Sequence, residues 1–256
     1  MTKIKTLILH APGTNCDIET GFAFRKAGSI VEAAPIDELV RRKRPLSGYQ
    51  IMVIPGGFTY GDDISAGKLL ANELRLKMGD DVQRFVDDGR LVLGICNGFQ
   101  VLLKAGILPR CNDVTRQSLT ITANDSGRFE CRWVHLQVNE AAPCVFTRGI
   151  RHMYLPVAHG EGKVLAAMGA AADFKVALYY CNEEGGTSAG YPHNPNGSIS
   201  NIAGICDASG RIFSLMPHPE RFVRWTQHPR WTREHNRDCG DGLQIFVNAV
   251  EWARTI

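Results

Sequence analysis

The feature that most constrains the fold is the alternation of short apolar runs with amphipathic stretches through the first hundred residues. In Ile51–Ile54 and Leu91–Ile95 the apolar residues are consecutive, as in strands that are covered on both faces of a parallel sheet. Between the runs, amphipathic stretches repeat apolar residues at helical spacing. The predicted strands are Thr6–Leu9, Gln50–Ile54 and Leu91–Ile95, and the predicted helices are Ile18–Ala27, Asp80–Asp88 and Gly98–Ala105. We therefore predict βαβ units and a doubly wound, mostly parallel α/β sheet with helices on both faces.

From Leu119 the pattern changes to strand-like segments separated by clusters of Gly, Asn and Pro, which indicates a mixed or antiparallel β extension. The predicted strands of this half are Leu119–Ala123, Phe129–Val138, Val176–Cys181, Ile202–Cys206 and Ile212–Met216. The segment Glu183–Ser198 is predicted to be a loop, and Leu243–Ala253 a final helix. Since no repeat or low-complexity linker interrupts the chain, we predict a single domain over residues 1–256.

Composition limits the classes of function. Apolar residues make up 44% and charged residues 21%, which is typical of soluble globular proteins and excludes a disordered chain. The net charge of +3 gives no reason to expect nucleic acid or an anionic membrane as a partner. We find no export signal and no membrane span in the sequence, and so expect a cytoplasmic protein. The eight cysteines are scattered without a CxxC pair, which favours reduced thiols over disulfides or a structural zinc site.

One cysteine occurs in a context that suggests chemistry. Cys96 lies within Gly94–Gly98, between a predicted strand and a predicted helix, which is the setting of a nucleophile elbow. The flanking glycines leave room for the sharp turn, and the helix N-terminus favours a thiolate. The N–H of Asn97 points the same way and is a natural donor to an oxyanion. The other seven cysteines are expected to be structural.

A histidine and a glutamate follow the strand Ile212–Met216. Because prolines flank His218, we expect an extended segment in which His218 and Glu220 lie on the same side. A carboxylate that fixes one imidazole tautomer, while the other nitrogen faces a thiol, activates a cysteine nucleophile. A zinc deaminase would need a Pro-Cys-x-x-Cys segment downstream, which the chain lacks. The sequence therefore predicts a triad of Cys96, His218 and Glu220.

Three glycine-rich segments are candidates for ligand sites. Pro55–Gly57 follows a buried strand, and its backbone can approach a ligand closely enough to supply a second oxyanion donor. The segment Gly61–Lys68 lacks the glycine spacing and the Ser or Thr of a P-loop, and Gly160–Gly162 lacks the third glycine of a dinucleotide fingerprint. We therefore predict no nucleotide, cofactor or metal site in this chain.

Together these motifs resemble those of the triad (class I) glutamine amidotransferases, which implies a flavodoxin-like fold. Finer motifs are similar to those of the glutaminase subunits of phosphoribosylformylglycinamidine synthases, enzymes of purine biosynthesis, and the resemblance covers about residues 5–252. The motifs that carry it are Gly56-Gly-Phe-Thr-Tyr-Gly-Asp62, Gly94-Ile-Cys-Asn-Gly-Phe-Gln100, Pro156-Val-Ala-His-Gly-Glu-Gly162, Asn194-Pro-Asn-Gly-Ser198 and Met216-Pro-His-Pro-Glu-Arg221.

The resemblance implies a role for each matching residue. Cys96 would be the nucleophile, His218 the base and Glu220 its partner, with oxyanion donors at Gly57 and Asn97 and substrate contacts from Gln100 and Phe58. Such glutaminases hydrolyse glutamine through a thioester and supply ammonia to a synthetase that acts on formylglycinamide ribonucleotide. ATP and Mg²⁺ would belong to that separate synthetase subunit. Whether the complex also contains a small third subunit stays open.

Two segments depart from the family pattern. Ser126–Val134 resembles the glutaminase domain of large single-chain synthetases, and Arg224–Gly240 resembles an insertion, which we expect to be a solvated surface loop rather than a docking surface. Two other functions remain open from the residues themselves. One is a cysteine hydrolase or peptidase of related α/β fold, and the other is a binding subunit with an inert elbow.

Overall fold

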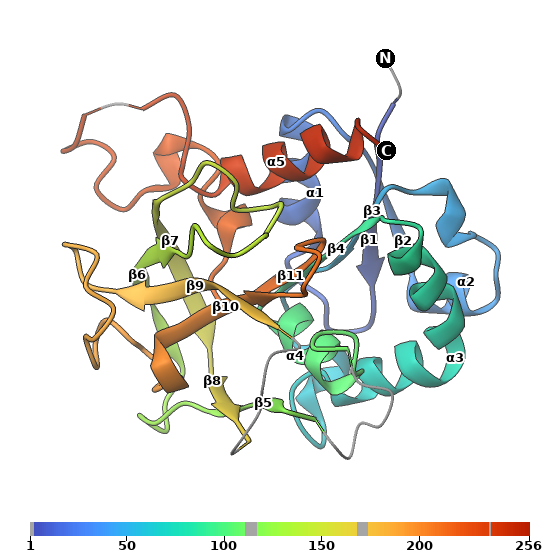
Figure 1. Ribbon diagram of the computed structural model, residues 1–256, viewed down its shortest axis with the longest axis horizontal. Coiled ribbons are helices and arrows are strands. Elements are labelled where there is room, and N and C mark those ends of the chain that lie inside the picture. The colour runs from blue at the N-terminus through green and yellow to red at the C-terminus, as the bar shows by residue number, and fades with distance from the viewer. Residues whose placement is uncertain (1–2, 111–116, 168–173, 236) are drawn as a thin grey trace.

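The computed structural model describes residues 3–110, 117–167, 174–235 and 237–256. The strands are β1 (Lys5–His10), β2 (Ile30–Pro35), β3 (Ile51–Ile54), β4 (Leu91–Ile95), β5 (Leu119–Ala123), β6 (Glu130–Val138), β7 (His152–His159), β8 (Glu161–Ala166), β9 (Lys175–Cys181), β10 (Ile202–Cys206) and β11 (Ile212–Leu215). The α-helices are α1 (Asp17–Lys26), α2 (Ile36–Val40), α3 (Lys68–Asp87), α4 (Asn97–Lys104) and α5 (Leu243–Ala253). A nine-stranded sheet has the order β2-β1-β3-β4-β11-β10-β9-β6-β7, and β5 pairs with β8 in a second sheet (Figure 1).

One half of the large sheet is parallel, as predicted. Strands β2, β1, β3, β4 and β11 pair in parallel. Every residue of β3, β4 and β11 is buried, because helices cover both faces of these strands. Helix α1 packs against α5, whereas α3 packs against α4, and Figure 1 shows the two pairs on opposite sides of the sheet. The predicted α/β class and doubly wound arrangement are confirmed.

The other half of the sheet is antiparallel and continuous with the first. Strands β11, β10, β9, β6 and β7 pair antiparallel in that order. Strand β11 therefore belongs to both halves, since it is parallel to β4 on one side and antiparallel to β10 on the other. Apart from Leu119–Ala123, which forms β5 of the second sheet, the predicted mixed extension is thus part of the same sheet and begins at its central strand.

Several elements differ from the sequence-based expectations. Strands β2, β7 and β8 and the short helix α2 were not predicted. In edge strand β2, Glu32 divides the apolar residues into two pairs, and only Ala34 is buried. The helix predicted at Asp80–Asp88 begins at Lys68 instead. Its buried residues recur every three or four positions from Leu70 to Phe85, and this packing outweighs the low helix propensity of Gly79.

The segment 224–240, of which residue 236 lies outside the described residues, is more firmly packed than expected. The Trp225 ring is buried and stacks on the buried His228, with ring centroids 5.0 Å apart and planes at 7°. The rings of Trp133 and Phe222 also pack against His228. The expectation of a solvated loop is therefore wrong for Trp225, although Trp231 is 46% exposed.

The described residues also bear on thiol state and membrane insertion. The seven described cysteines are free, and Cys111 lies outside the described residues. Within the four described ranges, no helix combines the length and apolar character needed to cross a membrane.

Candidate active site

The predicted elbow forms at the carboxyl end of β4, which pairs with the central strand β11. Cys96 joins β4 to α4 with φ 51° and ψ −103°, a strained backbone conformation for a residue with a side chain. Its N–H donates to the carbonyl of Leu215, at the end of the neighbouring strand β11, at 2.8 Å. A Cβ atom on Gly98 would lie 1.9 Å from the carbonyl oxygen of Ile54, so only glycine allows α4 to approach β3 this closely. The strand–turn–helix context of Cys96 is confirmed.

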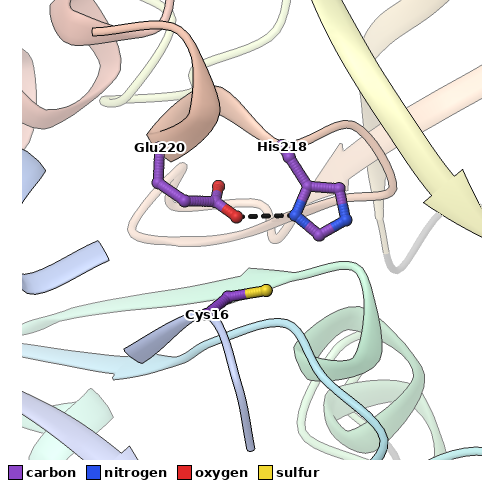
Figure 2. A group of neighbouring side chains, drawn as sticks. All are labelled: Cys16, His218 and Glu220. Carbon is purple, nitrogen blue, oxygen red and sulfur yellow. Dashed lines mark hydrogen bonds and ion pairs between the residues drawn. The ribbon is translucent and has the colours of Figure 1, made fainter. Parts of the chain in front are cut away.

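The predicted base and its partner meet at the end of β11. Figure 2 shows the His218 ring facing the Glu220 carboxylate, and Nδ1 of His218 lies 2.6 Å from Oε1 of Glu220. Both side chains are buried. The segment is not extended as predicted, because Pro219–Arg221 forms a single 3-10 turn. The backbone N–H of His218 donates to the carbonyl of Pro156 in β7 at 2.8 Å, which ties the base to the antiparallel half of the sheet.

The electrostatics of His218 favour a charged imidazole. Burial alone would disfavour the cation, but attraction to Glu220 and to the Cys96 sulfur outweighs burial and raises the pKa of His218 well above its usual value. Nε2 of His218 has no hydrogen-bond partner of ordinary geometry among the described residues. With Nδ1 occupied by Glu220, Nε2 is the nitrogen left to exchange a proton with the nucleophile and the leaving group.

Asn97, the first residue of α4, holds the loop that follows the Pro55–Gly57 turn. Its Oδ1 accepts a hydrogen bond from Oγ1 of Thr59 at 2.7 Å, and its Nδ2 donates to Oδ1 of Asp62 at 3.2 Å. The backbone N–H of Asn97 has no acceptor within the helix, because α4 begins there. Gly57 forms an antiparallel bridge with Thr14. The roles of Gly57 and Asn97 as oxyanion donors stay predictions.

The two predicted substrate-binding residues lie in different surroundings. Gln100 is buried, accepts a hydrogen bond from Nδ2 of Asn97 at 2.9 Å, and donates from Nε2 to the carbonyl of Glu161 at 2.6 Å. Its amide therefore links α4 to β8. Phe58 is 46% exposed, and its ring centroid lies 6.4 Å from that of Phe129. A direct contact of Gln100 or Phe58 with substrate stays a prediction.

His159 is the other histidine near the triad, and its surroundings do not suit a base. Its Nδ1 pairs with Oδ1 of Asn124 at 3.1 Å rather than with a carboxylate. Burial, together with the positive charge of nearby His218, lowers the pKa of His159 to about 3. A neutral imidazole with so low a pKa is a poor proton acceptor at neutral pH. The geometry thus favours His218 over His159 as the base.

Cys16, which was predicted to be structural, lies beside the base. Sγ of Cys16, a ring nitrogen of His218 and a carboxylate oxygen of Glu220 all lie within 4.8 Å of one another. Among the described residues this is the one such group of potential metal ligands. Nη2 of Arg221 lies 3.1 Å from the sulfur, however, and a guanidinium at that distance opposes a bound cation. One sequence signal could have indicated this position. Cys16 follows β1, and the carboxyl ends of the parallel strands β1, β3 and β4 lie at the same edge of the sheet.

The α/β sheet, the elbow cysteine and the His–Glu pair together define a cysteine-dependent amide hydrolase of the triad type. A sequence model of the CobB/CobQ-like glutamine amidotransferase domain matches residues 3–253, and the chain belongs to this family. The resemblance to triad glutamine amidotransferases is thereby confirmed.

Individual relatives show which glutamine amidotransferases the chain is similar to. The chain is 56% identical over 256 residues to phosphoribosylformylglycinamidine synthase subunit PurQ of Dehalococcoides mccartyi, with full coverage of both chains. It is 41% identical to the PurQ subunit of Methanococcus maripaludis, covering 97% of each chain. Among solved structures, it superposes on a chain of PurLQS from Thermotoga maritima with a TM-score of 0.74 and 29% identity, covering 98% of this chain and 99% of that one.

Proposed function

We propose that this chain is the glutaminase subunit of a phosphoribosylformylglycinamidine synthase. It hydrolyses glutamine to glutamate and ammonia and passes the ammonia to a separate synthetase subunit. The observation that carries this proposal is the elbow cysteine, Cys96, whose sulfur interacts with His218 of the buried His218–Glu220 pair. The end-to-end match to PurQ subunits supports glutamine as the substrate and purine biosynthesis as the pathway.

The residues divide the reaction into two steps. The Cys96 thiolate attacks the carboxamide carbon of glutamine, and the N–H groups of Gly57 and Asn97 stabilise the oxyanion that forms. His218 donates its Nε2 proton to the departing nitrogen, so that ammonia leaves and a thioester to Cys96 remains. His218 then takes a proton from water, which attacks the thioester and releases glutamate and the thiolate. Glu220 orients the imidazole and stabilises its positive charge throughout.

Substrate binding is assigned to the surroundings of the elbow. Gln100 lies one turn after Cys96 on α4, and Phe58 follows the Gly57 turn directly. The exposed ring of Phe58 provides apolar area against the methylene groups of glutamine. The buried Gln100 amide holds α4 against β8 and so fixes one wall of the site.

Ammonia formation in this mechanism needs no metal or cofactor. We assign ATP and Mg²⁺ to the synthetase subunit, which converts formylglycinamide ribonucleotide to formylglycinamidine ribonucleotide. The likeness to a chain of the PurLQS structure supports assembly with a synthetase and agrees with a third, small subunit in the complex.

A coupled assay tests the proposal. The purified chain is mixed with a candidate synthetase, ATP, Mg²⁺ and formylglycinamide ribonucleotide, and the glutamine consumed is compared with the formylglycinamidine ribonucleotide formed. We expect near-equal amounts and faster glutamine hydrolysis in the presence of the synthetase, because an oxyanion donor on a glycine turn can be aligned by a partner. The Cys96→Ser chain is the control, in which free ammonia but not glutamine should support product formation. Vigorous hydrolysis by the chain alone, unaffected by the synthetase, would contradict the coupling.

A further inference from the structure

Cys16 lies between the two parts of the catalytic machinery. Its backbone N–H donates to the carbonyl of Gly56 at 3.2 Å. In the opposite direction, the backbone N–H of Phe58 donates at 2.9 Å to the carbonyl of Gly13, which lies in the same loop as Cys16. The backbone of the segment from Gly13 to Cys16 therefore holds the turn that contains Gly57. The side chain of Cys16 lies beside the imidazole of His218 (Figure 2).

The sulfur of Cys16 is itself held in place. Nη2 of Arg221 donates to Sγ at 3.1 Å, and Sγ donates to Oδ1 of Asn15 at 3.1 Å. Arg221 is anchored in turn, because its Nε donates to Oε1 of Glu19 in α1 at 2.8 Å. Cys16 is only 1% exposed, so its sulfur is a fixed part of the wall around the base.

We propose that Cys16 is a positioning residue of the glutaminase, whose side chain packs against His218 and sets the base relative to the turn that carries Gly57. This inference rests on the proposed function. The close fit around the ring supports it, because a Cβ atom on Gly56 would lie 2.8 Å from Cε1 of His218 and 3.0 Å from Sγ of Cys16. Gly56 and Cys16 thus occupy adjacent positions against one edge of the imidazole.

The charges around the site explain why a thiol suits this position. Burial, reinforced by the nearby Glu220 carboxylate, raises the pKa of Cys16, although His218 and Arg221 act in the opposite direction. The thiol therefore stays neutral and adds no negative charge beside Glu220. The charged or titratable groups that act on His218 or on Cys16 beside it are Glu220, Cys96, Arg221 and His159. Cys16 is itself a group beside the ring that raises the pKa of His218 and takes no part in the proposed chemistry.

The test compares Cys16→Ala and Cys16→Ser with the parent chain in complex with its synthetase. Removal of the sulfur should lower kcat about tenfold or more and leave KM nearly unchanged, since small misplacements of a catalytic group act on the chemical step. Loss of the thiol should also lower the pKa of His218, so that the imidazolium gives up its proton at lower pH. The alkaline limb of the kcat–pH profile should therefore move to lower pH. Cys16→Ser keeps partners for Arg221 and Asn15 with a smaller atom, and should fall between the alanine variant and the parent.

Two controls separate positioning from folding. Cys181→Ala removes an equally buried thiol, 1% exposed, from strand β9, and should leave kcat and the pH profile unchanged. The rate at which a glutamine-analogue electrophile labels Cys96 in the isolated chain gives a second readout, which does not depend on the synthetase. If the alanine variant does not fold, the serine variant decides by the same two criteria.

A folded Cys16 variant with the parental kcat and alkaline limb would overturn the inference. The parent chain serves as the reference for the proposed function itself. If the parent hydrolyses no glutamine with its synthetase, the proposed function fails, whereas an active parent with unaffected Cys16 variants refutes only the positioning role.

Discussion

Substitution of Gly98 by alanine should damage both the stability and the chemistry of this protein. The added Cβ would lie 1.9 Å from the carbonyl oxygen of Ile54. An ordinary contact of about 3.4 Å between these two atoms requires α4 and β3 to separate by about 1.5 Å. Neither atom can move by itself, because the oxygen belongs to the backbone of β3 and the added Cβ to helix α4. Overpacking of this kind costs about 1–3 kcal/mol or more in the free energy of unfolding.

The same displacement acts on catalysis, because α4 begins directly after Cys96. A shift of about 1 Å in a reacting group lowers rates by about 10²-fold, so Gly98→Ala should lower kcat by at least that factor. Denaturant unfolding measures the stability, and coupled glutamine consumption measures kcat. The matched control is Gly79→Ala in α3, where a Cβ meets nothing within 4 Å, and which should stabilise the protein by up to about 1 kcal/mol. Equal effects of the two substitutions, or a fully active Gly98→Ala chain, would refute the steric argument.

The remaining predictions concern the triad and the segment after it. Cys96→Ser should abolish glutamine hydrolysis and covalent labelling by a glutamine analogue, and continued labelling at the parental rate would place the nucleophile elsewhere. His218→Ala should lower kcat by about 10⁵-fold and Glu220→Ala at least tenfold less, because the imidazole transfers the proton while the carboxylate orients it, and single-turnover kinetics checks this order. Trp225→Ala should lower the free energy of unfolding by about 3–5 kcal/mol, whereas exposed Trp231→Ala should change it by less than about 0.5 kcal/mol, and similar values for both would contradict the packing described.

The parts of the fold that the sequence predicted well are those with strong local signals. Continuous apolar runs identified β3 and β4, and the spacing of Gly94 and Gly98 identified the elbow, because each pattern reflects steric demands within a few residues. Local patterns also placed His218 and Glu220 in contact, although the 3-10 geometry that brings them together was not predicted.

The elements that were missed depend on contacts distant in sequence. Edge strand β2 buries only Ala34, and Glu32 interrupts its apolar residues. Helix α3 continues through Gly79 because a row of apolar residues packs on one side of it. Cys16 carries no motif, and its position beside His218 arises only when the carboxyl end of β1 meets the turn after β11. Such proximity is a property of the sheet order, which no local pattern contains.

The pairing of β11 with β4 makes the activity depend on complete assembly of the sheet. The nucleophile follows β4 and the base follows β11, so one parallel pairing between strands about 120 residues apart in the chain brings them together. A slip of that pairing by one residue would displace the base by about 3.3 Å and turn its strand's side chains to the opposite face. A chain in which β11 is missing or out of register therefore has no assembled catalytic site. Glutamine hydrolysis shows that this last strand has been inserted in the correct register.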